Sequence, residues 1–132
     1  ADRTGWRCVV LAGRGGLGGA AVVKPADEQA GAFAVEALTV AAGHRRAGYG
    51  MALLAAVEAE VSAAGGRVLL VDVPGGGAFA AGRQLLGRCG FVPAGEVRDF
   101  YRDGHTRVTF AKPVAAAVSA PPDAPAPQPA RA

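Results

Sequence analysis

The chain has 132 residues, of which 51% are hydrophobic and 19% are charged, a composition typical of a single folded domain and not of a disordered segment. The net charge is +3, but the basic residues are scattered along the sequence, so a nucleic-acid-binding protein is not favoured. Cys8 and Cys89 stand alone, which predicts neither a metal site nor a disulfide framework, and we expect a cytoplasmic protein because the sequence contains no signal-peptide or membrane-spanning pattern.

The first predicted elements are two strands, at residues 6–12 and 17–24, joined by a glycine-rich turn. The run from Gly13 to Gly18 also reads as GxGxxG, the spacing of a dinucleotide-binding turn. A dinucleotide-binding turn must be followed directly by a helix of several turns, and Pro25 leaves too few residues for such a helix. The pattern therefore favours a β-hairpin, followed by a polar loop over residues 25–31.

Residues 33–40 are apolar at nearly every position, which predicts a strand buried on both faces in the middle of a sheet. Glu36 is the only acid in this strand. From Met51 the sequence predicts a helix that ends at the glycine pair Gly65 and Gly66. Four apolar residues of this helix share one face and should pack on the sheet: Leu53, Leu54, Val57 and Val61.

The turn between this strand and this helix, residues 41–50, contains three glycines and two arginines. A turn of this kind directs free backbone N–H groups and the positive end of the helix dipole at one point. Glycines let a phosphate approach the backbone, and the guanidinium groups of Arg45 and Arg46 suit phosphate oxygens. The turn therefore predicts an anion site, which fits a pyrophosphate better than a carboxylate.

The remaining predicted elements are a strand at 67–73, a helix at 78–89, and strands at 96–102 and 106–112 that meet at an Asp103-Gly104 turn. The strand at 67–73 should lie parallel to the one at 33–40, because a helix links them. The order βββαβαββ indicates an α/β (α+β) fold with a mixed, mostly antiparallel sheet. Residues 1–114 form the expected core, and the Pro- and Ala-rich residues 115–132 are expected to be a disordered tail.

Several of these strings resemble the GNAT superfamily of acetyl-CoA-dependent N-acetyltransferases. Arg45-Arg46-Ala47-Gly48-Tyr49-Gly50 matches its Arg/Gln-x-x-Gly-x-Gly/Ala signature in the expected place, between a strand and a long helix. Residues 79–91, which end in Gly-Phe, and residues 99–112 are similar to later parts of the same core. The resemblance spans residues 6–114 and implies transfer of an acetyl group from acetyl-CoA to a primary amine of a small molecule or a protein.

The resemblance also implies how the cofactor is held. The central parallel strands should splay beneath the turn, and the pantetheine arm should lie in the splay like an added strand, with the thioester carbonyl near the Val40 N–H. No metal is expected. The residues predicted to bind CoA are Leu38, Thr39, Val40, Arg45, Arg46, Ala47, Gly48, Tyr49, Gly50 and Met51.

The catalytic groups are less well defined by the resemblance. Glu36 is the candidate base, since burial in an apolar strand would raise its pKa, although pairing with a basic residue is the alternative. Many members carry a tyrosine four residues before the Gly-Phe glycine, proposed as the acid that protonates the CoA thiolate. This chain has Leu86 there, so Tyr101 is the candidate replacement. His44 and His105 are expected to be solvated turn residues.

No part of this sequence resembles the usual first strand and first two helices of the superfamily. In the superfamily these elements form one wall of the acceptor pocket. We therefore expect a fragment, a minimal form, or a chain completed by a homodimer or a partner domain. The alternative function is a non-catalytic CoA-binding or protein-interaction module. Neither nucleic acid nor a membrane is expected as a partner.

Overall fold

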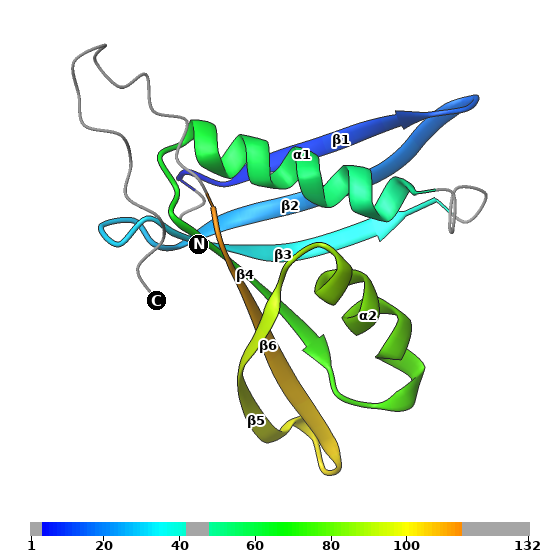
Figure 1. Cartoon of the computed structure of the whole chain (residues 1–132), viewed down its shortest axis with the longest axis vertical. Coiled ribbons are helices and arrows are strands. Elements are labelled where there is room, and N and C mark those ends of the chain that lie inside the picture. The colour runs from blue at the N-terminus through cyan, green and yellow to red at the C-terminus, as the bar shows by residue number, and fades with distance from the viewer. Residues whose placement is uncertain (1–3, 42–47, 115–132) are drawn as a thin grey trace.

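The computed structural model describes residues 4–41 and 48–114, which form one six-stranded sheet and two α-helices (Figure 1). The sheet order is β1-β2-β3-β4-β6-β5, and every neighbouring pair is antiparallel except β3 and β4. The predicted fold class and the order βββαβαββ are confirmed. The elements are β1 (Arg7–Gly13), β2 (Gly16–Asp27), β3 (Ala32–Val40), α1 (Tyr49–Ala63), β4 (Val68–Pro74), the short 3₁₀ helix η2 (Gly77–Phe79), α2 (Ala80–Arg88), β5 (Val92–Arg102) and β6 (His105–Pro113).

The GxGxxG run lies in the β1–β2 hairpin, as predicted. The turn needs glycine, because Gly15 has a φ of 71° and Gly16 has a φ of 147°. Gly18 serves a different purpose, since a Cβ there would lie 3.0 Å from the ring of Tyr49. The predicted loop at 25–31 was wrong at its start, because β2 continues through Pro25, which is paired with Phe33, to Asp27.

Helix α1 packs its predicted apolar face on the strands β1, β2 and β3. Leu53, Leu54, Val57 and Val61 are each at most 1% exposed, and each such burial stabilises the fold by about 1.5–3 kcal/mol. The helix ends as predicted, where Gly66 donates its N–H to the Val61 carbonyl at 2.8 Å. A Cβ on Gly66 would lie 2.3 Å from a Val61 methyl group, so only glycine fits there.

The second half of the core lies between α2 and the strands β4 and β6. Leu86, Phe91 and Phe110 are each at most 5% exposed. Lys112 of β6 joins this half to α1, because its Nζ forms an ion pair with Glu58 at 2.7 Å and donates to the Cys89 carbonyl at 2.7 Å. Both helices are therefore fixed to one strand.

Strands β3 and β4 diverge partway along their length. Their parallel pairing covers only Ala32–Val35 and Val68–Val71, although β3 continues to Val40 and β4 to Pro74. On the other side of β3, Val23 pairs with Val35 and Val22 pairs with Ala37, so Glu36 is an extra residue in a β-bulge. A bulge bends a strand and increases its twist, which accounts for the divergence.

The predicted splay of the central pair is thus confirmed, but the predicted burial of its first strand on both faces was wrong. Residues 36–39 are exposed. The physical reason is the splay itself, because this half of β3 is paired with β2 alone.

Candidate active site

A cavity of about 230 Å³ occupies the gap between β3 and β4, and we call it the splay cavity. Its walls come from both strands and both helices, which places it at the junction of the two halves of the core. It is lined by Val35, Glu36, Ala37, Leu38, Leu54, Val71, Asp72, Val73, Gly82, Leu85 and Leu86.

A second cavity of about 670 Å³, the turn cavity, lies at the start of α1. It shares Gly82 and Leu85 with the splay cavity, so the two are adjacent along α2. Together they extend from the first turn of α1 to the point where β3 and β4 part. The turn cavity is lined by Val40, Gly48, Gly50, Met51, Ala81, Gly82, Leu85 and Arg88.

The start of α1 has the features expected of an anion site. Gly48 caps the helix with a φ of 81°, a conformation that favours glycine. The first turn of α1 contains no acidic residue, and no side chain caps it. The N–H groups of a first helical turn have no partners within the helix, and the helix dipole makes this end positive. The turn cavity therefore ends at a site suited to phosphate.

Gly50 lies where α1 meets α2, and a side chain there would displace Leu85. A Cβ on Gly50 would lie 2.9 Å from Cδ2 of Leu85. Leu85 belongs to α2 and lines both cavities. The glycine therefore lets α1 and α2 approach each other where they form a common wall.

The structure brings part of the predicted cofactor set to these cavities. Leu38 lines the splay cavity, and Val40, Gly48, Gly50 and Met51 line the turn cavity. Thr39 lies on β3, paired with Ala20, and the Tyr49 ring lies against Gly18. The predictions for His44, Arg45, Arg46 and Ala47 fall outside the described residues.

Two carboxylates line the splay cavity. Glu36 forms an ion pair with Lys24, with 2.7 Å between Oε2 and Nζ, and its side chain is 45% exposed. The expected burial of Glu36 was therefore wrong, and the alternative of pairing with a basic residue is what the structure shows. Asp72, on β4, accepts a hydrogen bond from the Thr109 hydroxyl at 2.6 Å.

Arg107 stands beside Asp72, with 4.0 Å between its Nε and Oδ1 of Asp72. Its guanidinium carbon lies 4.2 Å from the centre of the Phe100 ring, a cation–π contact. The Nε atom is buried without a hydrogen-bond partner. Asp72 is thus held by the hydroxyl of Thr109 and by the positive charge of Arg107.

Tyr101, the candidate acid, lines neither the splay cavity nor the turn cavity. Its side chain is 45% exposed on β5, and its ring meets that of Phe100 edge-on at 5.0 Å. Leu86, at the position of the missing tyrosine, is 4% exposed and lines the splay cavity. An apolar side chain thus occupies the wall at the position where many members of the superfamily carry a tyrosine.

Sequence reasoning missed two charged residues of the cavities, Asp72 and Arg88. Asp72 was predicted only to be part of a strand and not to belong to the site. It is nevertheless an acid within an apolar run, which is the pattern that made Glu36 a candidate. Arg88 ends α2 and places a positive charge at the turn cavity. No local signal identified it, because its proximity to the start of α1 depends on the packing of the two helices.

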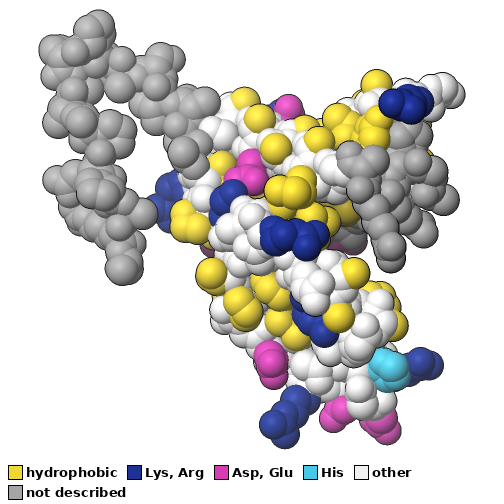
Figure 2. Space-filling view, turned by 45° about the vertical axis from the view of Figure 1, so that its right-hand side comes forward, with side chains coloured by type: hydrophobic (Ala, Val, Ile, Leu, Met, Phe, Trp, Pro, Cys, Tyr) yellow, Lys and Arg dark blue, Asp and Glu magenta, His cyan; other side chains and the backbone are white. Residues whose placement is uncertain are grey.

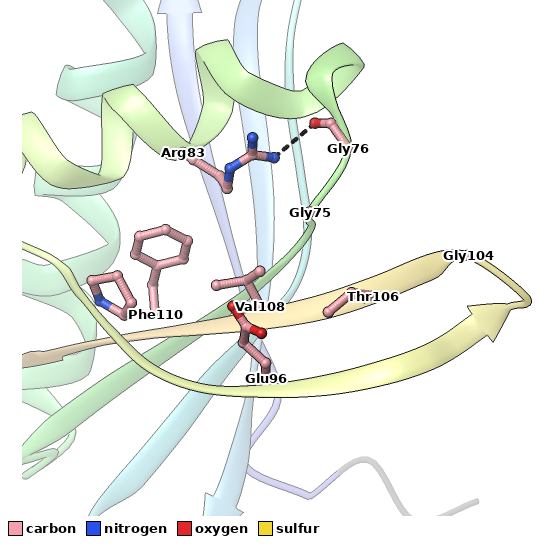
Figure 3. Close-up of a pocket in the computed structure, with 9 residues that line it drawn as sticks. Gly75, Gly76, Arg83, Glu96, Gly104, Thr106, Val108 and Phe110 are labelled. Carbon is pink, nitrogen blue, oxygen red and sulfur yellow. Dashed lines mark hydrogen bonds between the residues drawn. The ribbon is translucent and has the colours of Figure 1, made fainter.

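A third cavity, of about 460 Å³, lies between α2 and the β5–β6 hairpin (Figure 3). Arg83 enters it from above, and Glu96 points toward it from β5. One guanidinium nitrogen of Arg83 donates to the carbonyls of Pro74 and Gly76, at 2.7 and 2.8 Å. Arg83 therefore fixes the connection between β4 and α2, two walls of the splay cavity.

The surface shows no concentration of positive charge on the face drawn in Figure 2, where Lys and Arg side chains lie apart from one another among hydrophobic and neutral ones. Among residues 4–41 and 48–114, no group of three or more His, Cys, Asp or Glu side chains could hold a metal ion. Within the same residues, no helix has the length and apolar character needed to span a membrane.

The sequence matches no protein-family model, and no curated protein matches it. Solved structures do match. A GNAT-family acetyltransferase from Desulfovibrio desulfuricans is 29% identical, with a TM-score of 0.78 over 84% of this chain and 70% of that one. Nourseothricin acetyltransferase is 28% identical, with a TM-score of 0.70 over 86% and 68%. An aminoglycoside 6′-N-acetyltransferase complexed with coenzyme A is 14% identical, with a TM-score of 0.73 over 84% and 74%.

The chain therefore has the fold of the GNAT superfamily, with its two cavities at the splay of the central parallel strands. The two similar structures of 28–29% identity are acetyltransferases, which supports an acyltransferase of this type.

Proposed function

We propose that this protein transfers the acetyl group of acetyl-CoA to a primary amine of a small molecule or a protein. The observation that carries the proposal is the pair of adjacent cavities, which joins a phosphate-suited helix start to a gap lined by two carboxylates. Related structures support it, since one similar protein is named as an N-acetyltransferase and is complexed with coenzyme A.

In this proposal, the first turn of α1 and the preceding residues Arg45, Arg46 and Ala47 hold the pyrophosphate, and Arg88 adds a positive charge. The pantetheine arm lies in the two cavities along Leu38, Thr39 and Val40. This half of β3 has no β4 neighbour, so its backbone is free to bind the arm as an added strand.

The acceptor amine approaches the mouth of the splay, where Glu36 and Asp72 attract its ammonium form. One carboxylate takes a proton from the ammonium group, and the free amine nitrogen bonds to the thioester carbonyl carbon. The bond from that carbon to sulfur then breaks, and a second proton passes from the nitrogen to the departing thiolate, which leaves as the CoA thiol. Asp72 is better oriented for the proton transfer, because Thr109 fixes one of its oxygens and leaves the other free. Glu36 retains the role of second carboxylate, and Tyr101 remains a candidate acid only as the aromatic hydroxyl that could replace the tyrosine missing at Leu86.

The alternative is a non-catalytic CoA-binding module, which the apolar Leu86 in the cavity wall favours. Release of CoA thiol from acetyl-CoA, measured with a panel of amines and amino-terminal peptides, separates the two functions. Turnover that depends on an amine supports the transferase. Tight CoA binding without turnover by any amine would favour the module. The exposed mouth at residues 36–39 also agrees with an acceptor site completed by a second subunit or a partner domain.

A further inference from the structure

The apolar part of the splay cavity has no role in the reaction described so far. Its walls come from residues 35–38, 54, 71–73 and 82–86, so the cavity is formed by the middle of the chain, from β3 to α2. Apart from the two carboxylates, the lining consists of aliphatic side chains, alanine and glycine. Among the described residues that line it there is no basic side chain and no hydroxyl group.

The strand pattern separates this apolar part from the carboxylates. On β4, Val71 and Val73 pack against the hydrophobic core, whereas Asp72, between them, lies on the opposite face of the strand. Helix α2 lies over the gap where β3 and β4 part (Figure 1). The helix side of the cavity is closed by Leu54 of α1 and Leu86 of α2, which are 1% and 4% exposed. A group that enters from the turn cavity therefore meets hydrocarbon on the helix side.

The volume of the splay cavity, about 230 Å³, exceeds what an acetyl group requires. An apolar cavity of about 150 Å³ stays free of water and is large enough for benzene, which has six carbon atoms. An acetyl group places a single methyl group beyond the thioester carbonyl. It would leave much of the cavity empty, and empty volume in a close-packed interior lacks dispersion contacts.

We propose that the splay cavity holds the acyl chain of the donor and admits uncharged chains of about three to six carbons, in addition to acetyl. The inference rests on the proposed function, in which the pantetheine arm reaches this cavity from the turn cavity and carries the acyl group at its end. The transfer step is the same as for acetyl. The carbonyl carbon exchanges its bond to sulfur for a bond to the amine nitrogen, the second proton of the nitrogen goes to the thiolate, and the products are a longer amide and the CoA thiol.

The charges around the cavity predict which acyl groups are rejected. A succinyl group has as many carbons as a butyryl group but ends in a carboxylate. In the apolar part of the cavity this carboxylate would lose its water without gaining a donor, and Glu36 and Asp72 would repel it. Lys24 and Arg107 stand beside these two acids but do not line the cavity.

The first test is donor binding by the full chain without an acceptor, measured by calorimetry with CoA, acetyl-CoA, propionyl-CoA, butyryl-CoA and succinyl-CoA. Each methylene added to acetyl should tighten binding about fourfold, the value of a methylene removed from water. Succinyl-CoA should bind more weakly than butyryl-CoA. Affinity that is constant or falls from acetyl to butyryl, or equal binding of succinyl and butyryl, overturns the inference and leaves the proposed function standing. A protein that binds none of the five overturns both.

The second test fills the cavity from Gly82 of α2. The nearest atom to a Cβ on Gly82 is Cγ1 of Val73, at 4.0 Å, so a side chain fits there and extends toward β4. Leucine is also a better helix former than glycine, so Gly82→Leu should fold. It should lower the ratio of butyryl-CoA to acetyl-CoA affinity by about tenfold, the gain from two methylenes. Gly82→Ala should shift the ratio less, in the same direction, and provides the answer if the leucine variant binds no CoA.

The matched control is Gly87→Leu on the same helix, where a Cβ meets nothing within 4 Å, and it should keep the ratio of the unmodified protein. A ratio that stays unchanged in both Gly82 variants places the acyl chain elsewhere and overturns the inference.

The third test is transfer itself, with an amine that supports acetyl transfer. Butyryl-CoA should yield the butyrylamide, identified by mass spectrometry, with a kcat/KM at least equal to that of acetyl-CoA. Acetyl transfer without butyryl transfer would support the proposed function and overturn the inference.

Discussion

Glu36 and Asp72 occupy the first positions beyond the parallel ladder of β3 and β4. Val35 and Val71 are the last paired residues, and the next residue of each strand is a carboxylate that lines the splay cavity. The two acids thus share the mouth of the cavity while each is held by its own neighbour, Lys24 for Glu36 and Thr109 for Asp72.

The first prediction concerns these carboxylates. Asp72→Asn should lower kcat by about 10²–10⁴-fold, the usual contribution of a general base, while the affinity for acetyl-CoA stays the same. Glu36→Gln should have a smaller effect on kcat and should mainly raise KM for the amine. Steady-state kinetics with both substrates varied would measure these effects. A larger loss of kcat in Glu36→Gln would transfer the role of base to Glu36.

The second prediction concerns the glycines of the turn. Gly48→Val should abolish CoA binding, because a β-branched residue is strained at a φ of 81° and its side chain would block the phosphate. Gly50→Val should do the same by forcing Leu85 into the cavities. Gly87→Ala is the matched control, since a Cβ there meets nothing within 4 Å. Calorimetry with CoA measures the affinities, and normal binding by both folded valine variants would contradict the cofactor assignment.

The third prediction concerns the arginine that begins the GNAT signature. Arg45→Ala should weaken CoA binding by about 1.5–3 kcal/mol, the value of a charge-assisted hydrogen bond, without abolishing it. The penalty should vanish when dephosphorylated pantetheine replaces CoA in the same titration, because that ligand offers no phosphate. An equal loss for both ligands would show that Arg45 acts on the structure of the turn.

The fourth prediction compares two ion pairs. Lys112→Met should destabilise the fold by about 1–3 kcal/mol, because it leaves Glu58 and the Cys89 carbonyl without their partner in a partly buried position. Lys24→Met should cost only about 0–1 kcal/mol, since the pair with Glu36 is exposed. Urea unfolding gives both values. Similar losses would mean that Lys112 does not join the two halves of the core.

The fifth prediction concerns the two thiols. Burial raises the pKa of the Cys89 thiol above its ordinary value, and the negative charge of Glu58 adds to this effect. A raised pKa leaves less reactive thiolate at mildly alkaline pH. Cys8 is exposed and should therefore be alkylated first, with Cys89 reacting slowly until the pH is raised further. Mass spectrometry of Cys8→Ser, which should show only slow labelling, is the check.

Much of the fold could be predicted because its signals are local. The spacing of Leu53, Leu54, Val57 and Val61 defines the buried face of α1, and Asp103-Gly104 defines a hairpin turn. The GxGxxG run could be assigned to a hairpin because Pro25 excludes a following helix. Each of these inferences depends on residues within a few positions of one another.

The sequence by itself therefore determined the order of the elements, the hairpin and the glycine turn at the start of α1. Only the tertiary structure decided that Glu36 is a bulged, exposed residue, because a bulge is defined by the register of β3 against β2. It likewise decided that Asp72 and Glu36 share a cavity and that Arg88 lies near the start of α1. These relationships depend on where the strands part and how the helices pack, which is set by contacts between residues far apart in the chain.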